Sequence, residues 1–132
     1  MKFSNTALVV LSLAYLGSPY IIAAEQKIED INAKQAASLV SENKELKVLD
    51  VRTAWEFKGG HIQGASLIDA TAPDFEDKVS KLDRQQSYLV HCASGGRSKS
   101  AIAIMKKLGF QNVYHLESGF NGWKAAGKPV AK

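Results

Sequence analysis

The sequence predicts an α/β fold in which a central parallel sheet is covered by helices on both faces. Three short apolar runs have the composition of buried parallel strands, at residues 47–51, 88–90 and 112–116. Helical patterns lie between these runs, and this alternation of strand and helix is typical of a parallel sheet. We expect a single domain over residues 25–132, because that length suits one hydrophobic core.

The first elements of this domain are a short lead-in and a capped helix. Residues 25–31 form the lead-in and could add a small strand at the sheet edge. Asn32 followed by Gln35 is typical of a capping box, so we expect a helix that begins there and ends near Ser41. Its predicted buried face carries Ala36, Leu39 and Val40.

Shorter elements follow the first central strand. Residues 53–58 are predicted as one turn of helix in which Phe57 belongs to the core. Trp55 is also expected to pack, although it could instead form a wall of the ligand pocket. The expected role of His61 is a hydrogen bond across the next turn, which leads to a short strand at residues 66–69.

Two further helices complete the predicted fold. Pro73 stands near the start of a short amphipathic helix, and its apolar residues are Phe75, Val79 and Leu82. The longest predicted helix covers residues 98–108 and ends before Gly109, a typical residue just beyond a helix. The strand at 112–116 is followed by a loop and a short final helix at 120–126, in which Trp123 is expected to pack in the core.

The loop between the strand at 88–90 and the longest helix is the candidate site. It contains Cys92, the only cysteine of the chain, followed by Gly95, Gly96 and Arg97. Such a loop lies at the carboxyl end of a strand, where open α/β sheets bind ligands. The amino end of a helix also favours an anion. Because this position and Arg97 both favour the charged sulfur, we expect Cys92 to be partly ionised at neutral pH.

Two charged residues are expected at the same edge of the sheet as Cys92. Asp50 and Arg52 follow the first central strand, and the carboxyl ends of parallel strands meet at one edge. Asp50 could orient Arg97 or the loop backbone, or it could simply cap a turn. Arg52 could attract an anionic substrate, or it could form a surface ion pair with Glu56.

The histidines do not suggest a catalytic pair or a metal centre. His91 directly precedes Cys92, but adjacent strand residues point to opposite faces of a sheet. We therefore interpret His91 as a structural residue. The three histidines are scattered, and with a single cysteine no metal-ligand spacing exists.

Three segments resemble the single-domain rhodanese family of sulfurtransferases. The loop C-A-S-G-G-R-S at residues 92–98 is similar to the active-site loop of that family. The segment L-D-V-R-T-A-W-E-F-K-G-G-H-I-Q-G-A at 49–65 resembles an upstream signature. The segment V-Y-H-L-E-S-G-F-N-G-W-K-A-A-G-K-P-V at 113–130 resembles the closing one. Four residues separate Cys92 from Arg97, whereas the similar cradle of cysteine-dependent phosphatases has five, and a smaller pocket suits a sulfane sulfur.

The resemblance implies the rhodanese fold and a thiosulfate sulfurtransferase that needs no cofactor. Cys92 would take the outer sulfur of thiosulfate as a persulfide and pass it to cyanide or to a thiol acceptor. Arg97 would bind the donor's oxygens or shape the loop. The remaining implied contacts to the persulfide are backbone N–H groups of the loop, from Ala93, Ser94, Gly95, Gly96 and Ser98.

The sequence is also compatible with other functions. A phosphatase or an arsenate reductase could use the same kind of loop. A non-catalytic rhodanese module could bind a protein partner, and a sulfur carrier could deliver its sulfur to another protein.

Residues 1–24 resemble a secretory signal, which predicts export to the periplasm. Lys2 is followed by an uncharged apolar run at residues 7–16 and by a segment, residues 17–24, that ends in small residues. The alternative is an uncleaved membrane anchor, whereas no stable membrane insertion is expected after cleavage. Cleavage removes Lys2 alone among the charged residues and leaves 16 basic and 13 acidic residues, a net charge of +3. The basic residues are dispersed, so we expect no nucleic-acid partner.

Overall fold

Five parallel strands form one sheet in the order β1-β5-β4-β2-β3. In this computed structural model they are β1 (Lys27–Ile31), β2 (Lys47–Asp50), β3 (Ser66–Leu67), β4 (Ser87–His91) and β5 (Asn112–Leu116). The structure describes Gly17 and residues 25–132. The predicted signal at residues 1–24 therefore lies, apart from Gly17, outside the described residues.

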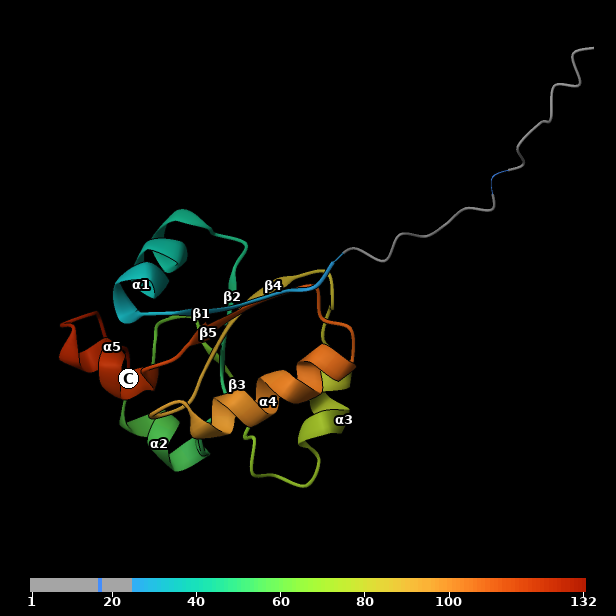
Figure 1. Cartoon of the computed structure of the whole chain (residues 1–132). Helices are drawn as coiled ribbons and strands as arrows, with labels where there is room; N and C mark the ends of the chain where they lie inside the picture. Colours follow the sequence, from blue (N-terminus) through green and yellow to red (C-terminus); the bar gives the residue numbers. More distant parts are fainter. Residues whose placement is uncertain (1–16, 18–24) are drawn as a thin grey trace, which may run out of the picture.

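Helices cover both faces of this sheet, which confirms the predicted fold class (Figure 1). One face is covered by α1 (Ala33–Glu42) and α5 (Gly119–Ala125), and the other by α3 (Phe75–Ser80) and α4 (Gly96–Lys107). The short helix α2 (Ala54–Gly59) lies near the amino end of α4. The arrangement places the amino ends of α4 and α5 at the edge where β4 and β5 end.

The strands alternate between two hydrophobic cores, as their spacing requires. Val48 and Leu89 belong to the core beneath α1 and α5, whereas Leu49 and Val90 belong to the core beneath α3 and α4. β2 and β4 run side by side with Val48 opposite Leu89 and Leu49 opposite Val90. β2 and β4 therefore contribute matched apolar residues to both cores.

The capping box predicted at the first helix is confirmed. The Asn32 side chain accepts a hydrogen bond from the Gln35 N–H at 2.9 Å, and the Gln35 side chain accepts one from the Asn32 N–H at 2.9 Å. The lead-in before it forms β1, whose five residues all pair with β5. α4 begins at Gly96, two residues before the predicted start and directly after Gly95, whose φ is 107°.

The prediction that Trp55 packs in the core is wrong. Its side chain is 84% exposed, because α2 is a short helix of 6 residues from which Trp55 points to solvent. The prediction that Phe57 belongs to the core is also wrong, because Phe57 is half-buried and stacks on His61, with ring centroids 3.8 Å apart, outside both cores. The predicted contact of His61 across its turn is confirmed by a hydrogen bond between its Nδ1 and the Phe57 carbonyl oxygen at 3.0 Å.

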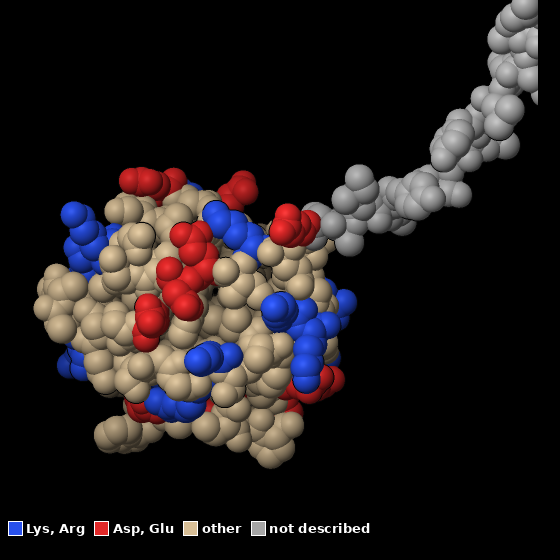
Figure 2. Space-filling model, in the orientation of Figure 1, with Lys and Arg blue, Asp and Glu red and all other residues tan. Residues whose placement is uncertain are grey.

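Acidic and basic side chains are interspersed on the face of the molecule that Figure 2 shows. Acidic groups lie near the middle of this face and along its upper rim, and basic groups lie at both sides and toward the bottom. Of the helices in the described part of the chain, none has the length and apolar character needed to cross a membrane.

Candidate active site

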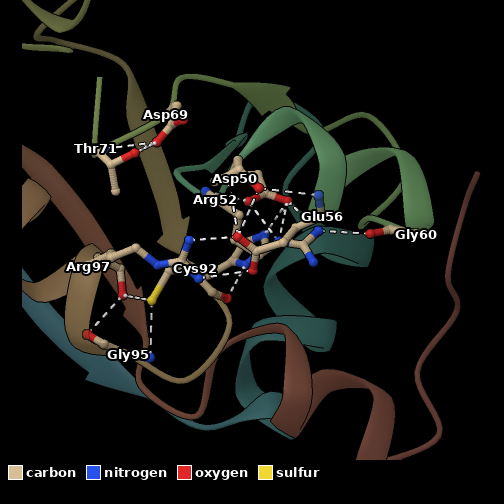
Figure 3. A network of polar contacts seen from close by, with 12 residues as sticks. Asp50, Arg52, Glu56, Gly60, Asp69, Thr71, Cys92, Gly95 and Arg97 are labelled. Atoms are coloured by element: carbon tan, nitrogen blue, oxygen red, sulfur yellow. Dashed lines mark hydrogen bonds and ion pairs between the residues drawn. The ribbon is translucent and has the colours of Figure 1, made fainter. Parts of the chain in front are cut away.

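Cys92 lies directly after β4, at the start of the loop that leads into α4. Its side chain is 1% exposed. The Gly95 N–H donates a hydrogen bond to Sγ at 3.1 Å, and the Ser98 Oγ lies 3.3 Å from Sγ (Figure 3). The loop thus curls around its own cysteine, and the predicted placement of the backbone N–H groups near the sulfur agrees with this geometry at Gly95.

Two opposing effects set the pKa of the Cys92 thiol. Burial raises the pKa, because a thiolate loses hydration in the protein interior. Hydrogen bonds from the Ser98 hydroxyl and from the N–H groups of Ser98, Gly95 and Ser94 outweigh burial and lower the pKa below its ordinary value. The predicted lowering of the Cys92 pKa is therefore supported, but its cause is local hydrogen bonding by the loop and by Ser98.

The amino end of α5 holds the outer side of this loop. The Phe120 N–H donates to the Cys92 carbonyl oxygen at 2.8 Å, and the Asn121 N–H donates to the Ala93 carbonyl oxygen at 3.0 Å. The loop carbonyls therefore point away from the sulfur. Sequence reasoning predicted a short helix here but missed its function as the loop's hydrogen-bonding partner.

Two glycines make this close approach possible. Gly119 has a φ of 64°, and a Cβ on it would collide with the Ala93 carbonyl and lie 2.7 Å from the Ser94 nitrogen. Gly95 has a φ of 107°, and its Cβ would lie 2.5 Å from the Glu117 carbonyl oxygen. Both backbone conformations strongly favour glycine, so the two loops can pack against each other only with glycine at these positions.

Arg97, in the first turn of α4, forms a bidentate ion pair with Glu56 of α2. Its Nη1 lies 2.7 Å from Glu56 Oε1 and its Nη2 lies 3.0 Å from Oε2. The Arg97 hydrogen bonds lower the pKa of Glu56 to about 2, so the carboxylate remains charged. The predicted pair of Glu56 with Arg52 is wrong, because a second capping box on Thr53 turns Glu56 toward Arg97.

Asp50 and Arg52 form a buried ion pair with each other. The Asp50 carboxylate accepts hydrogen bonds from Arg52 Nε at 3.0 and 3.1 Å and from Nη2 at 2.8 Å. Arg52 also donates to the Gly60 carbonyl at 2.8 Å and lies over the Phe120 ring at 4.2 Å. With Arg52 only 4% exposed, neither the predicted surface pair nor the capture of an anionic substrate fits its surroundings.

The turn-cap alternative for Asp50 agrees with the structure. Its Oδ1 accepts a hydrogen bond from the Arg52 backbone N–H at 3.0 Å, and its carboxylate is occupied by the Arg52 guanidinium. The other alternative, orientation of Arg97 or of the loop backbone, does not agree with the structure, because Glu56 contacts Arg97 and the hydrogen bonds of the Asp50 carboxylate go to Arg52. Asp50 and Arg52 therefore hold the chain that leads from β2 into α2, and through it they support the position of Glu56.

Sequence reasoning missed two residues behind the loop, His115 and Asp30. The Ser98 Oγ lies 2.7 Å from His115 Nε2, and His115 Nδ1 lies 2.9 Å from Asp30 Oδ1.

His91 lies on the other face of the sheet from Cys92, near the Phe120 ring. Within the described residues there is no group of three or more His, Cys, Asp or Glu side chains that could hold a metal ion.

Comparisons with known proteins agree with this geometry. The sequence profile of the rhodanese-like domain matches residues 32–126. The chain is 34% identical over 95 residues to the thiosulfate sulfurtransferase GlpE of Pseudomonas entomophila, covering 72% of this chain and 84% of GlpE. It is 34% identical to the solved structure of a rhodanese-related protein from Thermoplasma volcanium, with a TM-score of 0.67 and coverage of 78% and 97%.

A longer relative contains this domain as one part. The chain is 29% identical over 107 residues to the probable adenylyltransferase/sulfurtransferase MoeZ of Mycobacterium tuberculosis. The match covers 81% of this chain but only 27% of MoeZ.

The fold and the loop define an α/β domain with a cysteine in an anion-binding loop at the edge of its sheet. The chain belongs to the rhodanese-like domain family, a family that includes sulfurtransferases.

Replacing Gly119 should disturb both stability and the loop around Cys92. We expect Gly119→Ala to lower the free energy of unfolding by about 1–3 kcal/mol more than Gly127→Ala, because its methyl group overpacks against the loop. Gly127 is the matched control, since it also has a positive φ, of 70°, but has nothing within 4 Å of its Cβ. Urea unfolding of both variants measures the difference, and equal losses would contradict the proposed steric contact.

Removing Arg52 should be far more costly than removing a surface cation. Arg52→Ala leaves the Asp50 carboxylate buried without its partner, which we expect to cost about 3–5 kcal/mol of unfolding free energy. Lys81→Ala breaks an exposed pair with Asp77 and should change stability by less than about 1 kcal/mol. A similar, small effect of both substitutions in urea unfolding would show that the Asp50 pair is not needed for the fold.

The Arg97–Glu56 ion pair should make the free energy of unfolding depend on pH. The folded-state pKa is about 2, below the ordinary 4.5, so the unfolded chain binds more protons between these values. The stabilisation by Glu56 is thus fully present above pH 4.5 and is lost as the pH falls toward 2. Because both side chains are partly exposed, we expect Glu56→Gln to cost about 1 kcal/mol at neutral pH.

Urea unfolding of wild type and Glu56→Gln between pH 3 and pH 7 tests this expectation. The difference in unfolding free energy should shrink as the pH is lowered. Glu76→Gln is the control, because Glu76 is exposed and makes no ion pair within the described part of the chain. A constant difference across this range would rule out the depressed pKa of Glu56.

Proposed function

We propose that this protein transfers a sulfane sulfur from thiosulfate to cyanide or to a thiol through a persulfide on Cys92. The observation that carries this proposal is the buried Cys92 sulfur, which accepts a hydrogen bond from Gly95 and lies against Ser98 in a loop that lowers its pKa. Membership of a family that includes thiosulfate sulfurtransferases supports it.

The first step forms the persulfide. The Cys92 thiolate attacks the outer sulfur of thiosulfate, and a bond forms between the two sulfurs. The sulfur–sulfur bond of thiosulfate breaks, and its electron pair leaves with sulfite. The outer sulfur of the resulting persulfide carries the negative charge, which the inward N–H groups of the loop stabilise.

The second step restores the thiolate. Cyanide attacks the outer sulfur and leaves with it as thiocyanate, while the electron pair of the broken sulfur–sulfur bond returns to Cys92. The hydrogen bonds from Gly95 and Ser98 that stabilise the thiolate nucleophile also stabilise it as the leaving group. No net proton transfer and no cofactor enter either step.

Arg97 has a defined place in this proposal. Glu56 engages its Nη1 and Nη2 atoms, which fixes the plane of the guanidinium at the entrance of the loop. The remaining N–H groups of Arg97 serve the oxygens of thiosulfate. The charge of Arg97 is largely balanced by Glu56, so the guanidinium orients the donor more than it attracts it.

The four-residue spacing between Cys92 and Arg97 supports sulfur transfer over phosphate-ester or arsenate chemistry. Delivery of the sulfur to a protein acceptor uses the same first step and differs only in the second.

We also propose that the apolar segment at residues 7–16 directs export to the periplasm and that cleavage follows Ala24, which rests on the sequence pattern alone.

Intact mass spectrometry tests the persulfide. Thiosulfate should add one sulfur atom to the wild-type protein, and cyanide should remove it. Cys92→Ala should gain nothing because it lacks the only thiol, and Cys92→Ser should gain nothing because a hydroxyl cannot form a persulfide.

The same spectra separate the alternatives. If reduced wild-type protein gains no sulfur from thiosulfate, the proposed donor is wrong and a binding module or another sulfur donor takes its place. A persulfide that cyanide and small thiols cannot remove would indicate a sulfur carrier for a protein acceptor.

A further inference from the structure

A continuous line of polar contacts leads from the Cys92 sulfur to the protein surface. Ser98 Oγ lies 3.3 Å from Cys92 Sγ and 2.7 Å from His115 Nε2, and His115 Nδ1 lies 2.9 Å from Asp30 Oδ1. Cys92 and Ser98 are buried, and the His115 side chain is 6% exposed, whereas that of Asp30 is 66% exposed. The line therefore connects a buried thiol with a solvated carboxylate.

The sheet register explains why these groups meet. Asp30 and His115 are direct partners in the parallel pairing of β1 with β5, so their side chains project from the same face. His115 is also the partner of Val90 on β4, two residues before Cys92. Ser98 lies in the first turn of α4, and its Oγ contacts both Cys92 Sγ and His115 Nε2.

The hydroxyl proton of Ser98 can serve only one acceptor at a time. While Cys92 is a thiol, Ser98 can accept from its S–H and donate to His115 Nε2, which is the shortest of the Ser98 contacts. When Cys92 is a thiolate, the hydroxyl donates to the sulfur instead, and His115 Nε2 then donates to the Ser98 oxygen. The two arrangements differ by two short proton shifts.

We propose that Asp30 and His115 are positioning residues which, through Ser98, take up the proton of Cys92 and maintain the thiolate. The thiol proton moves to the Ser98 oxygen, and the hydroxyl proton of Ser98 moves to His115 Nε2. A neutral thiol and a neutral imidazole become a thiolate and an imidazolium, and Asp30 accepts a hydrogen bond from Nδ1–H of the imidazolium. No atom or electron is gained or lost.

Other charged groups near His115 limit how strongly this relay acts. Lys99 and Glu117 line the same surface hollow as Asp30 and His115, so a positive and a negative charge both face the imidazole from solvent. His91 lies within electrostatic range of His115, and burial lowers the pKa of His91, which keeps it uncharged. Asp30 is therefore the carboxylate in direct contact with His115.

The relay predicts that removing His115 or Asp30 shifts the titration of the only thiol. The ultraviolet absorbance of the thiolate, followed against pH without any sulfur donor, measures this directly. We expect His115→Asn to reduce the thiolate fraction at neutral pH about tenfold, since loss of the imidazolium raises the pKa of Cys92. Asp30→Asn should reduce it about threefold, because solvent screens the exposed carboxylate.

Matched variants separate the relay from a structural role. Asp30→Glu keeps the carboxylate and should restore the thiolate fraction. His61→Asn removes a histidine whose ring contacts Phe57 and not Ser98, and it should leave the fraction unchanged. Asp30 is exposed, so its variants test the relay even if His115→Asn does not fold. A wild-type titration curve for folded Asp30→Asn would overturn the proposal.

A kinetic measurement links the relay to sulfur transfer. This measurement rests on the proposed function, whereas the titrations above do not. The rate of persulfide formation in Asp30→Asn should fall at neutral pH and recover at alkaline pH, where the thiolate forms unaided. Shifted titration curves without persulfide formation in the wild type would overturn the sulfur transfer and leave the relay standing. Normal sulfur transfer with unchanged titration curves would overturn the relay alone.

Discussion

The arrangement at the site depends on one constraint, which is that the loop after β4 must find partners for its carbonyl oxygens on its outer side. Buried backbone groups must be paired, and an inward N–H group implies a carbonyl that points outward. The N–H groups of Phe120 and Asn121 receive the carbonyls of Cys92 and Ala93. The shape of the loop around the sulfur is thus set by α5, a helix that lies beyond the next strand.

This constraint also explains why the site is built from both sides of the sheet. α4 packs on one core and α5 on the other, and their amino ends meet over the ends of β4 and β5. Gly119 lets α5 approach the loop closely enough to donate its N–H groups. Below them, the Asp50–Arg52 pair and the stacking of Arg52 on Phe120 tie the chain after β2 to α5. The segments that follow β2, β4 and β5 are therefore held together at one edge of the sheet.

The sequence predicted the fold and the position of Cys92 because both depend on local patterns. A few consecutive residues are enough to recognise the apolar runs, the Asn32 capping box and the Gly95–Gly96 turn. The partners of the charged groups are set by register and by helix placement between distant segments. Glu56 lies 41 residues before Arg97 and Asp30 lies 85 residues before His115. The T-x-x-E pattern at Thr53 is the one local signal that could have placed Glu56, since a capping box fixes its backbone direction.

The pairing of both arginines near the site changes how an anion is bound there. Arg52 is neutralised by Asp50 and Arg97 by Glu56, so the loop itself contributes little free positive charge. The groups in direct contact with the negative sulfur are then an N–H dipole and the Ser98 hydroxyl, which are neutral. Such groups stabilise a charge at short range and lose strength quickly with distance. A site that must release one anion and accept another in each cycle benefits from this, because uniformly tight binding of the anions would slow their exchange.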